Sequence, residues 1–173
     1  MSEPIEESGM IFIADNTFHI EESQLYKDVR GYGVKTVEFI RVKSNDKSSE
    51  LLFVEAKPTF ANPTNPSPDN LRKFRKSIKD ICAKFVFSLC LFSAINAGVT
   101  EYDFPDDFIL LNKVSIKLYL VIRNYELGWC KKLKIALDHG LPTYLKKMWK
   151  PEVLVINEKT AIEQGIAVCR QVS

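Results

Sequence analysis

Alternating apolar and polar positions predict a β-hairpin in the first third of the chain. Residues 34–42 and 50–57 are rich in β-branched and aromatic side chains, and the polar residues 44–49 between them are suited to a hairpin connection. Residues 10–20 predict two shorter extended pieces around a turn, and residues 21–33 predict a short helix with glycines at its end. We therefore expect a short helix followed by two antiparallel strands.

A long amphipathic helix is predicted to follow a proline-rich loop. Residues 58–68 contain four of the eight prolines, which cannot continue a strand ladder, and Asp69 or Asn70 can cap the next helix. The uncharged residues 85–100 are fewer than the roughly 20 needed to span a bilayer, so a buried helix and no membrane contact are expected. Apolar residues recur at three- and four-residue steps, at Leu71, Phe74, Ile78, Ile81, Phe85, Leu89, Phe92 and Ile95. Basic residues lie largely off this stripe, at Arg72, Lys73, Arg75, Lys76 and Lys79.

The remainder of the chain predicts further strands and helices in alternation. Residues 108–124 alternate as a strand does, and residues 127–139 read as a helix that Gly140 can end. Residues 142–149 predict a short helix, residues 152–157 a strand, and residues 158–168 a last helical segment. This order predicts an α/β fold with a mixed central sheet and helices packed on it.

Bulk composition indicates one globular domain spanning residues 1–173. The 173 residues are 46% hydrophobic and 27% charged, which excludes a disordered tail, a fibre or a disulfide-stapled miniprotein. The four cysteines form no CxxC pair and there are only two histidines, so a zinc site is not expected. Cysteines within an apolar helical pattern fit free thiols in a reducing compartment, and the first apolar run is too short for a signal peptide. We expect a cytoplasmic protein.

Charge is distributed unevenly although the formal net charge is only +2. Residues 1–22 carry six acidic and no basic side chains, residues 69–84 carry six basic and two acidic, and residues 113–150 carry nine basic and two acidic. Such asymmetry favours a polyanion on one face, and a merely solvated lysine-rich surface gives the same pattern. Both interpretations stay open at this point.

The second predicted strand places two charged side chains on a covered surface. Both faces of residues 51–54 are apolar, which is typical of a strand covered on both sides, yet Glu55 and Lys57 share one face at its end. If the turn centres between residues 46 and 47, Glu38 lies opposite Glu55 with the Cβ atoms about 5 Å apart. Carboxylates so close repel each other, and Mg²⁺ between them converts the repulsion into a binding site.

Lys57 completes this candidate site. An ammonium beside the ion can orient a metal-bound water or offset charge on a transferring phosphoryl group. A simpler alternative has Glu55 paired with Lys57 or another cation, Glu38 solvated at an edge, and a hairpin register shifted by one residue. The spacing alone leaves both alternatives open.

The order of these residues resembles the PD-(D/E)xK nuclease superfamily. Glu38, followed by Glu55-Ala56-Lys57 at the end of an apolar strand, lies between a short helix and a long one, as in the restriction-endonuclease-like core. The resemblance implies that Glu38 and Glu55 bind Mg²⁺ or Mn²⁺, that Lys57 is the catalytic lysine, and that Glu22 or Glu21 adds a further acid. It covers residues 20–124, and residues 125–173 would form a helix-strand-helix extension of the same domain.

We therefore predict a metal-dependent nuclease-like protein that hydrolyses phosphodiester bonds of nucleic acid. DNA is favoured over RNA as the partner, and a homodimer stays open because cutting both strands at once requires two subunits. The alternative is a catalytically inactive binding or scaffold protein that retains the nuclease fold. The expected contacts to the nucleic-acid backbone are Arg72, Lys73, Lys76 and Lys79.

Overall fold

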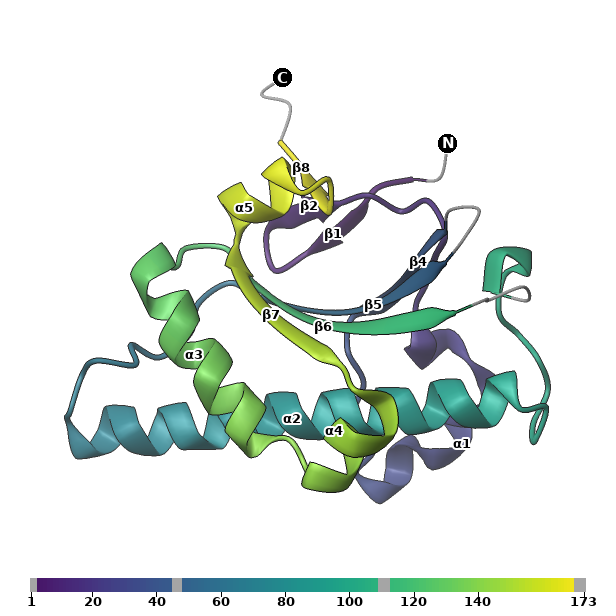
Figure 1. Ribbon diagram of the computed structural model, residues 1–173, viewed down its shortest axis with the longest axis horizontal. Coiled ribbons are helices and arrows are strands. Elements are labelled where there is room, and N and C mark those ends of the chain that lie inside the picture. Colours follow the sequence, from purple (N-terminus) through teal and green to yellow (C-terminus); the bar gives the residue numbers. More distant parts are fainter. Residues whose placement is uncertain (1–2, 45–47, 109–112, 170–173) are drawn as a thin grey trace.

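The computed structural model describes residues 3–44, 48–108 and 113–169, and these form a mixed α/β fold of two sheets and five α-helices. The central sheet has the order β3-β4-β5-β6-β7, and a small sheet has the order β1-β2-β8. Figure 1 shows the central sheet as a middle layer, with the long helix α2 on one side and the small sheet with α5 on the other. The predicted mixed sheet with helices packed on it is confirmed.

The central sheet is antiparallel in its first half and parallel in its second half. Strands β3 (Thr17–Phe18), β4 (Phe39–Ser44) and β5 (Ser49–Lys57) pair antiparallel. Strands β6 (Val114–Ile122) and β7 (Glu152–Asn157) then continue from β5 in parallel. Because parallel neighbours need long crossovers, α2 connects β5 to β6, and two shorter helices connect β6 to β7.

The hairpin has the predicted register. Ile40 lies opposite Phe53 and Val42 lies opposite Leu51. Strand β4 begins later than predicted, at Phe39, but the Glu38 backbone N–H still donates to the Val54 carbonyl at 3.0 Å. Glu38 is therefore held beside Val54 of β5.

Both faces of β5 are buried, as its sequence predicts. Phe53 belongs to the larger apolar cluster under α2, and Val54 belongs to the smaller cluster under the small sheet. Both side chains are fully buried, as is Glu55 beside them. Side chains at successive strand positions point to opposite faces, so Leu51, Phe53 and Glu55 all face α2.

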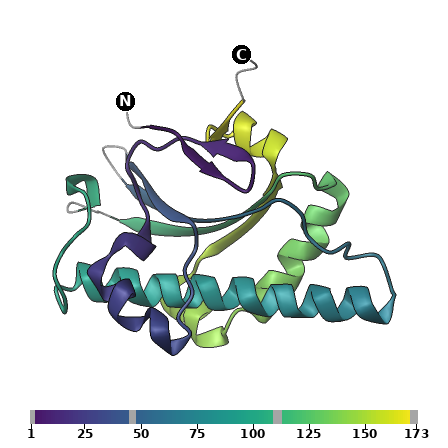
Figure 2. The same cartoon turned by 180° about the vertical axis from the view of Figure 1, so that it is seen from behind.

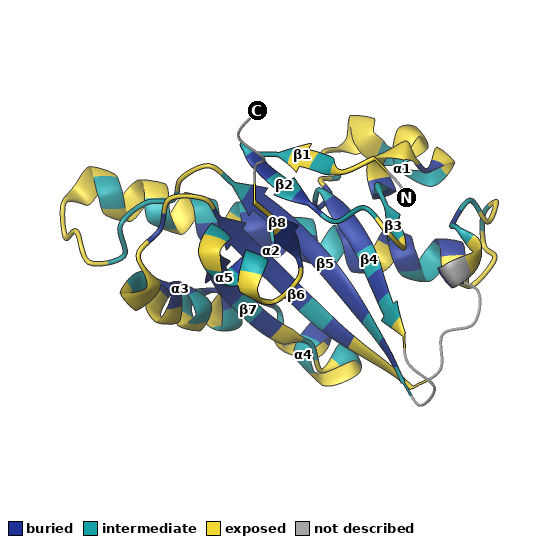
Figure 3. Ribbon diagram, turned by 90° about the horizontal axis from the view of Figure 1, so that it is seen from above, coloured by how far each residue is buried: buried dark blue, intermediate teal, exposed yellow. Residues whose placement is uncertain are grey.

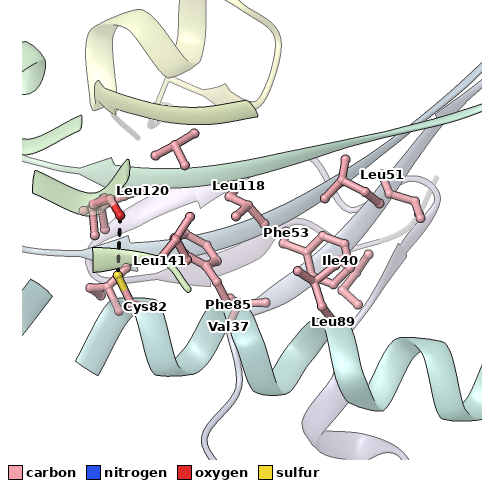
Figure 4. Close-up of a cluster of buried hydrophobic side chains, with 14 of the residues drawn as sticks. Val37, Ile40, Leu51, Phe53, Cys82, Phe85, Leu89, Leu118, Leu120 and Leu141 are labelled. Atoms are coloured by element: carbon pink, nitrogen blue, oxygen red, sulfur yellow. Dashed lines mark hydrogen bonds between the residues drawn. The ribbon is translucent and has the colours of Figure 1, made fainter. Parts of the chain in front are cut away.

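Helix α2 (Pro68–Asn96) buries the predicted apolar stripe against the sheet. Figure 4 shows Cys82, Phe85 and Leu89 of α2 directed toward Phe53 and Leu118 of the central strands. The predicted cap was wrong by two or three residues, because Ser67 caps the helix and Pro68 occupies its first turn. Among the described residues, no helix has the length and apolarity to cross a membrane.

Helix α3 (Leu127–Gly140) packs beside α2 and ends at Gly140, one residue past the predicted range. A Cβ built on Gly140 would lie 2.9 Å from Cys82 Sγ and 3.1 Å from Ile78 Cγ2. The missing side chain therefore allows the two helices to approach closely. The Cys82 thiol donates to the Leu137 carbonyl at 3.7 Å across the same contact.

The segments at the two ends of the chain lie together on the other face of the sheet (Figures 1 and 2). Strands β1 (Ile5–Glu7) and β2 (Met10–Phe12) form a hairpin, and β8 (Ala167–Val168) pairs with β2. Residues 158–168 are therefore not one helical segment as predicted. Helix α5 (Glu158–Glu163) stops before Gly165, whose positive φ of 65° turns the chain into β8.

Short helices complete the covering layer. Helix α1 (Gln24–Val29) confirms the predicted helix before the hairpin, and α4 (Thr143–Trp149) confirms the one after Pro142. Single 3₁₀ turns are η1 (Ile20–Glu22), η2 (Arg30–Tyr32) and η3 (Asp106–Phe108). Gly33, with φ of 80°, ends the α1–η2 segment.

Candidate active site and adjoining lysine pocket

A completely buried carboxylate lies near the end of β5. The Glu55 side chain is 0% exposed, and its Oε1 atom accepts contacts at 2.8 Å from the ammonium groups of both Lys57 and Lys84. Lys84 Nζ also donates to Glu55 Oε2 at 3.0 Å. A buried charge is costly unless it is paired and hydrogen-bonded, and these two lysines supply both requirements.

Lys84 joins the two predicted acids. It lies on α2 beside Phe85, and its Nζ atom is 3.6 Å from Glu38 Oε1 while it bonds Glu55. The side chain of Lys84 is 20% exposed and that of Glu38 is 23% exposed. The structure therefore brings Glu38, Glu55 and Lys57 into one ion cluster, whose central cation is an ammonium of the chain itself.

The sequence signal for Lys84 was weak but present. Lys84 follows Ile81 by three positions and precedes Phe85 directly, so it borders the buried stripe of α2, unlike the exposed basic residues earlier in the helix. A buried Glu55 requires a cation on whatever packs against its face of the sheet. Only the packing of α2 across β5 then selects Lys84 as that cation.

Burial and the neighbouring charges shift the pKa values of Glu55 and Lys84. Burial raises the pKa of the Glu55 carboxyl above its usual value, and the ammonium groups of Lys84 and Lys57 act in the opposite direction. Burial alone would lower the pKa of Lys84, but the carboxylates of Glu55 and Glu38 raise it above its usual value. The ammonium of Lys84 is therefore held in its charged form by the two acids.

The third predicted acid does not join this cluster. Glu22 is the exposed last residue of the 3₁₀ turn η1, and no three His, Cys, Asp or Glu side chains of the described residues gather as metal ligands do. The carboxylate of Glu7 on β1, in contrast, interacts electrostatically with Glu38. Its pKa is raised by burial and then by the negative charge of Glu38. The backbone position of Glu38 is in turn supported by His19, whose Nδ1 atom is 3.1 Å from the Glu38 carbonyl oxygen.

The donors present fit the divalent cation that the sequence resemblance implies. Carboxylate oxygens are the ligands that Mg²⁺ prefers, and those of Glu38 and Glu55 already converge on one positive charge. The Lys84 ammonium occupies that point. A divalent cation can therefore use these two acids only when the Lys84 ammonium withdraws.

A pocket of about 600 Å³ adjoins the cluster, and four of its eleven lining residues are lysines; we call it the lysine pocket. Lys57 and Lys84 line it while bonding Glu55, so each ammonium is shared between the buried carboxylate and the pocket. Lys35 and Lys73 line its outer part. Asp80 is the only acidic residue among the lining residues, and it pairs with Lys35 at 2.9 Å.

The predicted backbone-binding residues lie on the first half of α2. This part of the helix projects past the sheet and is mostly exposed in Figure 3. One of the four, Arg72, pairs with Asp69 at 3.0 Å on the surface, and a second, Lys73, lines the pocket. All four are exposed, at Arg72, Lys73, Lys76 and Lys79.

Comparison of the chain with protein-family models, with curated proteins and with solved structures finds no match.

Proposed function

We propose that this protein is a metal-dependent, nuclease-like hydrolase of phosphodiester bonds in nucleic acid, with Glu38, Glu55 and Lys57 at its centre. One observation carries the proposal. Three side chains chosen from the sequence meet in a single ion cluster, although an intervening hairpin turn separates Glu38 from the other two. Polar groups this costly to bury are retained at sites of chemistry more often than in ordinary cores.

The order of elements supports a restriction-endonuclease-like core. A short helix precedes the β4–β5 hairpin, the ExK triplet lies at the end of β5, and α2 leads to β6 in parallel beside it. This is the order that the sequence resemblance implies. Residues 125–169 then extend the same sheet by β7 and add α5 and β8.

Each residue has a task in the proposed reaction. When bound by Glu38 and Glu55, Mg²⁺ or Mn²⁺ supplies Lewis-acid chemistry that activates water and offsets phosphate charge. Lys57 places an ammonium between Glu55 and the pocket, where it stabilises charge that develops on the phosphoryl oxygens. The exposed basic residues of α2 hold the nucleic-acid backbone, with DNA favoured over RNA, in a cytoplasmic protein.

A cleavage assay tests the proposal. Single- and double-stranded DNA and RNA are incubated with Mn²⁺ and with wild type, Lys57→Ala or Lys159→Ala. Lys159→Ala is the matched control, because Lys159 is exposed on α5, lies outside the lysine pocket and is not among the residues proposed to hold the nucleic-acid backbone. We expect cleavage by wild type and Lys159→Ala and at least about a 100-fold loss in Lys57→Ala. Equal cleavage by wild type and Lys57→Ala would exclude this centre as the source of activity.

Lys84 favours one second candidate, a nuclease-fold protein that binds nucleic acid without cutting it. Together with Lys57, its ammonium balances the two negative charges of Glu38 and Glu55, so the cluster is complete without a metal. This candidate predicts nucleic-acid binding that is unchanged by Mn²⁺ and by chelation, together with no cleavage of any of the four substrates. The same assay therefore separates the two functions.

A further inference from the structure

Two segments of the chain form the walls of the lysine pocket. Residues 59–61, directly after β5, form one wall, and the pocket side of α2 forms the other. The Phe60 ring packs edge-on against Phe74 of α2 at 6.0 Å and against Tyr125 at 6.4 Å between ring centroids. The Tyr125 hydroxyl also donates to the Ala61 carbonyl at 3.3 Å. These contacts fix the segment after β5, so the space in front of the lysines is preformed.

Positive charge exceeds negative charge in this pocket. Four lysines line it, and Asp80 is the single acidic residue among its lining residues. Asp80 is 43% exposed and its partner Lys35 is 50% exposed, so this ion pair is weak and easily exchanged for another anion. Within the described chain, no carboxylate lies within ion-pair distance of Lys73, which is free to bind a ligand.

Lys57 and Lys84, which we call the inner lysines, are less free to bind a ligand. Glu55 forms ion pairs with Lys57 and Lys84, and Glu38 lies within ion-pair distance of Lys84. These carboxylates offset part of the positive charge of the two lysines. A ligand with one negative charge gains little by competing with these carboxylates. A ligand with close to two charges on one compact group, with several oxygens, can contact the inner and outer lysines together.

We propose that this pocket binds a phosphomonoester, and specifically the terminal phosphate of a nucleic-acid strand. A phosphomonoester carries a charge of about −1.5 to −2 and three strong acceptor oxygens, whereas a backbone diester carries a single charge. The hydroxyl groups of Thr59 and Ser77 border the same space and suit the remaining oxygens. The choice of a strand end over a small phosphate ester rests on the proposed function, since the pocket shares Lys57 with the nuclease centre.

Binding without metal tests this inference independently of cleavage. Fluorescence anisotropy in EDTA compares one labelled DNA oligonucleotide with a 5′-phosphate, with a 3′-phosphate, and with neither. The variant Lys73→Met removes a pocket ammonium, and Lys76→Met is the control, because Lys76 is exposed on the same helix and does not line the pocket. Both lysines are on the surface, so both variants should fold, which circular dichroism verifies.

We expect wild type to bind either the 5′-phosphorylated or the 3′-phosphorylated strand about tenfold more tightly than the unphosphorylated strand. A tenfold preference is the gain expected from one additional charge-assisted contact. Lys73→Met should reduce this preference to about twofold or less, while Lys76→Met should weaken all three strands alike. Equal binding of the three strands by wild type overturns the inference. A preference that Lys73→Met leaves unchanged overturns it as well.

Competition with inorganic phosphate and adenosine monophosphate identifies the source of the phosphate. If either displaces the labelled strand at concentrations near or below the strand's own dissociation constant, the ligand is a small phosphate ester and the strand-end assignment is overturned. Failure of the proposed nuclease function is distinguishable, because it abolishes cleavage and leaves the metal-free preference intact. Cleavage by a wild-type protein that shows no phosphate preference would overturn the phosphate-binding inference and leave the nuclease function standing.

Discussion

Replacing Lys84 by methionine tests how the buried cluster is stabilised. Methionine preserves much of the side-chain volume and removes the ammonium that contacts Glu55 at 2.8 and 3.0 Å. Removing one partner of a buried ion pair costs about 3–5 kcal/mol. Lys57 still contacts Glu55 at 2.8 Å and keeps part of the compensation, so we expect a loss below this range, about 2–3 kcal/mol.

The loss should be visible in the melting temperature. For a chain of this length, about 1 kcal/mol corresponds to roughly 2–4 °C, so Lys84→Met should melt about 4–12 °C below wild type. A decrease below about 1 °C in metal-free buffer would refute the conclusion that Lys84 compensates the buried charge of Glu55.

Divalent metal should reverse this loss. In Lys84→Met the oxygens of Glu38 and Glu55 are no longer occupied by an ammonium, so Mg²⁺ or Mn²⁺ can bind without displacing a side chain. At 100 times its dissociation constant, a ligand stabilises the folded state by about 2.7 kcal/mol, enough to restore most of the melting temperature. Wild type should respond less at the same concentration. The double variant Lys84→Met/Glu38→Gln is the control and should not respond, and a Lys84→Met protein insensitive to millimolar metal would contradict the proposed metal site.

Three further results are expected. Gly140→Ala should lower the free energy of unfolding by about 1–3 kcal/mol in chemical denaturation, despite the better helix propensity of alanine, because its Cβ would lie 2.9 Å from Cys82 Sγ. Because burial raises the pKa of Glu55, the folded protein binds the Glu55 proton more tightly than the unfolded chain does. The stabilisation from this proton is complete below pH 4.5 and is lost as pH rises through the raised pKa. Glu55→Gln should therefore flatten the curve of stability against pH above pH 4.5, and an unchanged slope there would argue against a raised pKa of Glu55. Iodoacetamide should label the exposed Cys90 and Cys169 first and Cys82 last, since burial raises the pKa of the Cys82 thiol to about 11, and mass spectrometry of timed samples checks the order.

Local patterns in the sequence predicted most of the elements, because each element has its own periodicity. The stripe from Phe74 to Ile95 defined α2, and the paired apolar positions of the hairpin defined its register. The ladder ends at Phe39 opposite Val54 and does not include the predicted pair of Glu38 and Glu55, and the two acids meet through the ammonium of Lys84.

The errors arose where distant segments decide the structure. Residues 167–168 form a strand only because β2, at the other end of the chain, offers a free edge, which the local helical pattern of residues 158–168 could not indicate. The role of Lys84 depends on how α2 lies across β5, a tertiary relation that no local pattern contains. The predicted acid Glu22 depended on the position of η1, which lies outside the cluster.

Anomalous scattering from Mn²⁺ in crystals of the wild-type protein tests the proposed centre most directly. The metal-site account predicts, at saturating Mn²⁺, an anomalous peak between the carboxylates of Glu38 and Glu55 and an ammonium of Lys84 displaced toward the lysine pocket. Crystals soaked in the same Mn²⁺ concentration that show no peak there, with Lys84 still bonded to both acids, would contradict it.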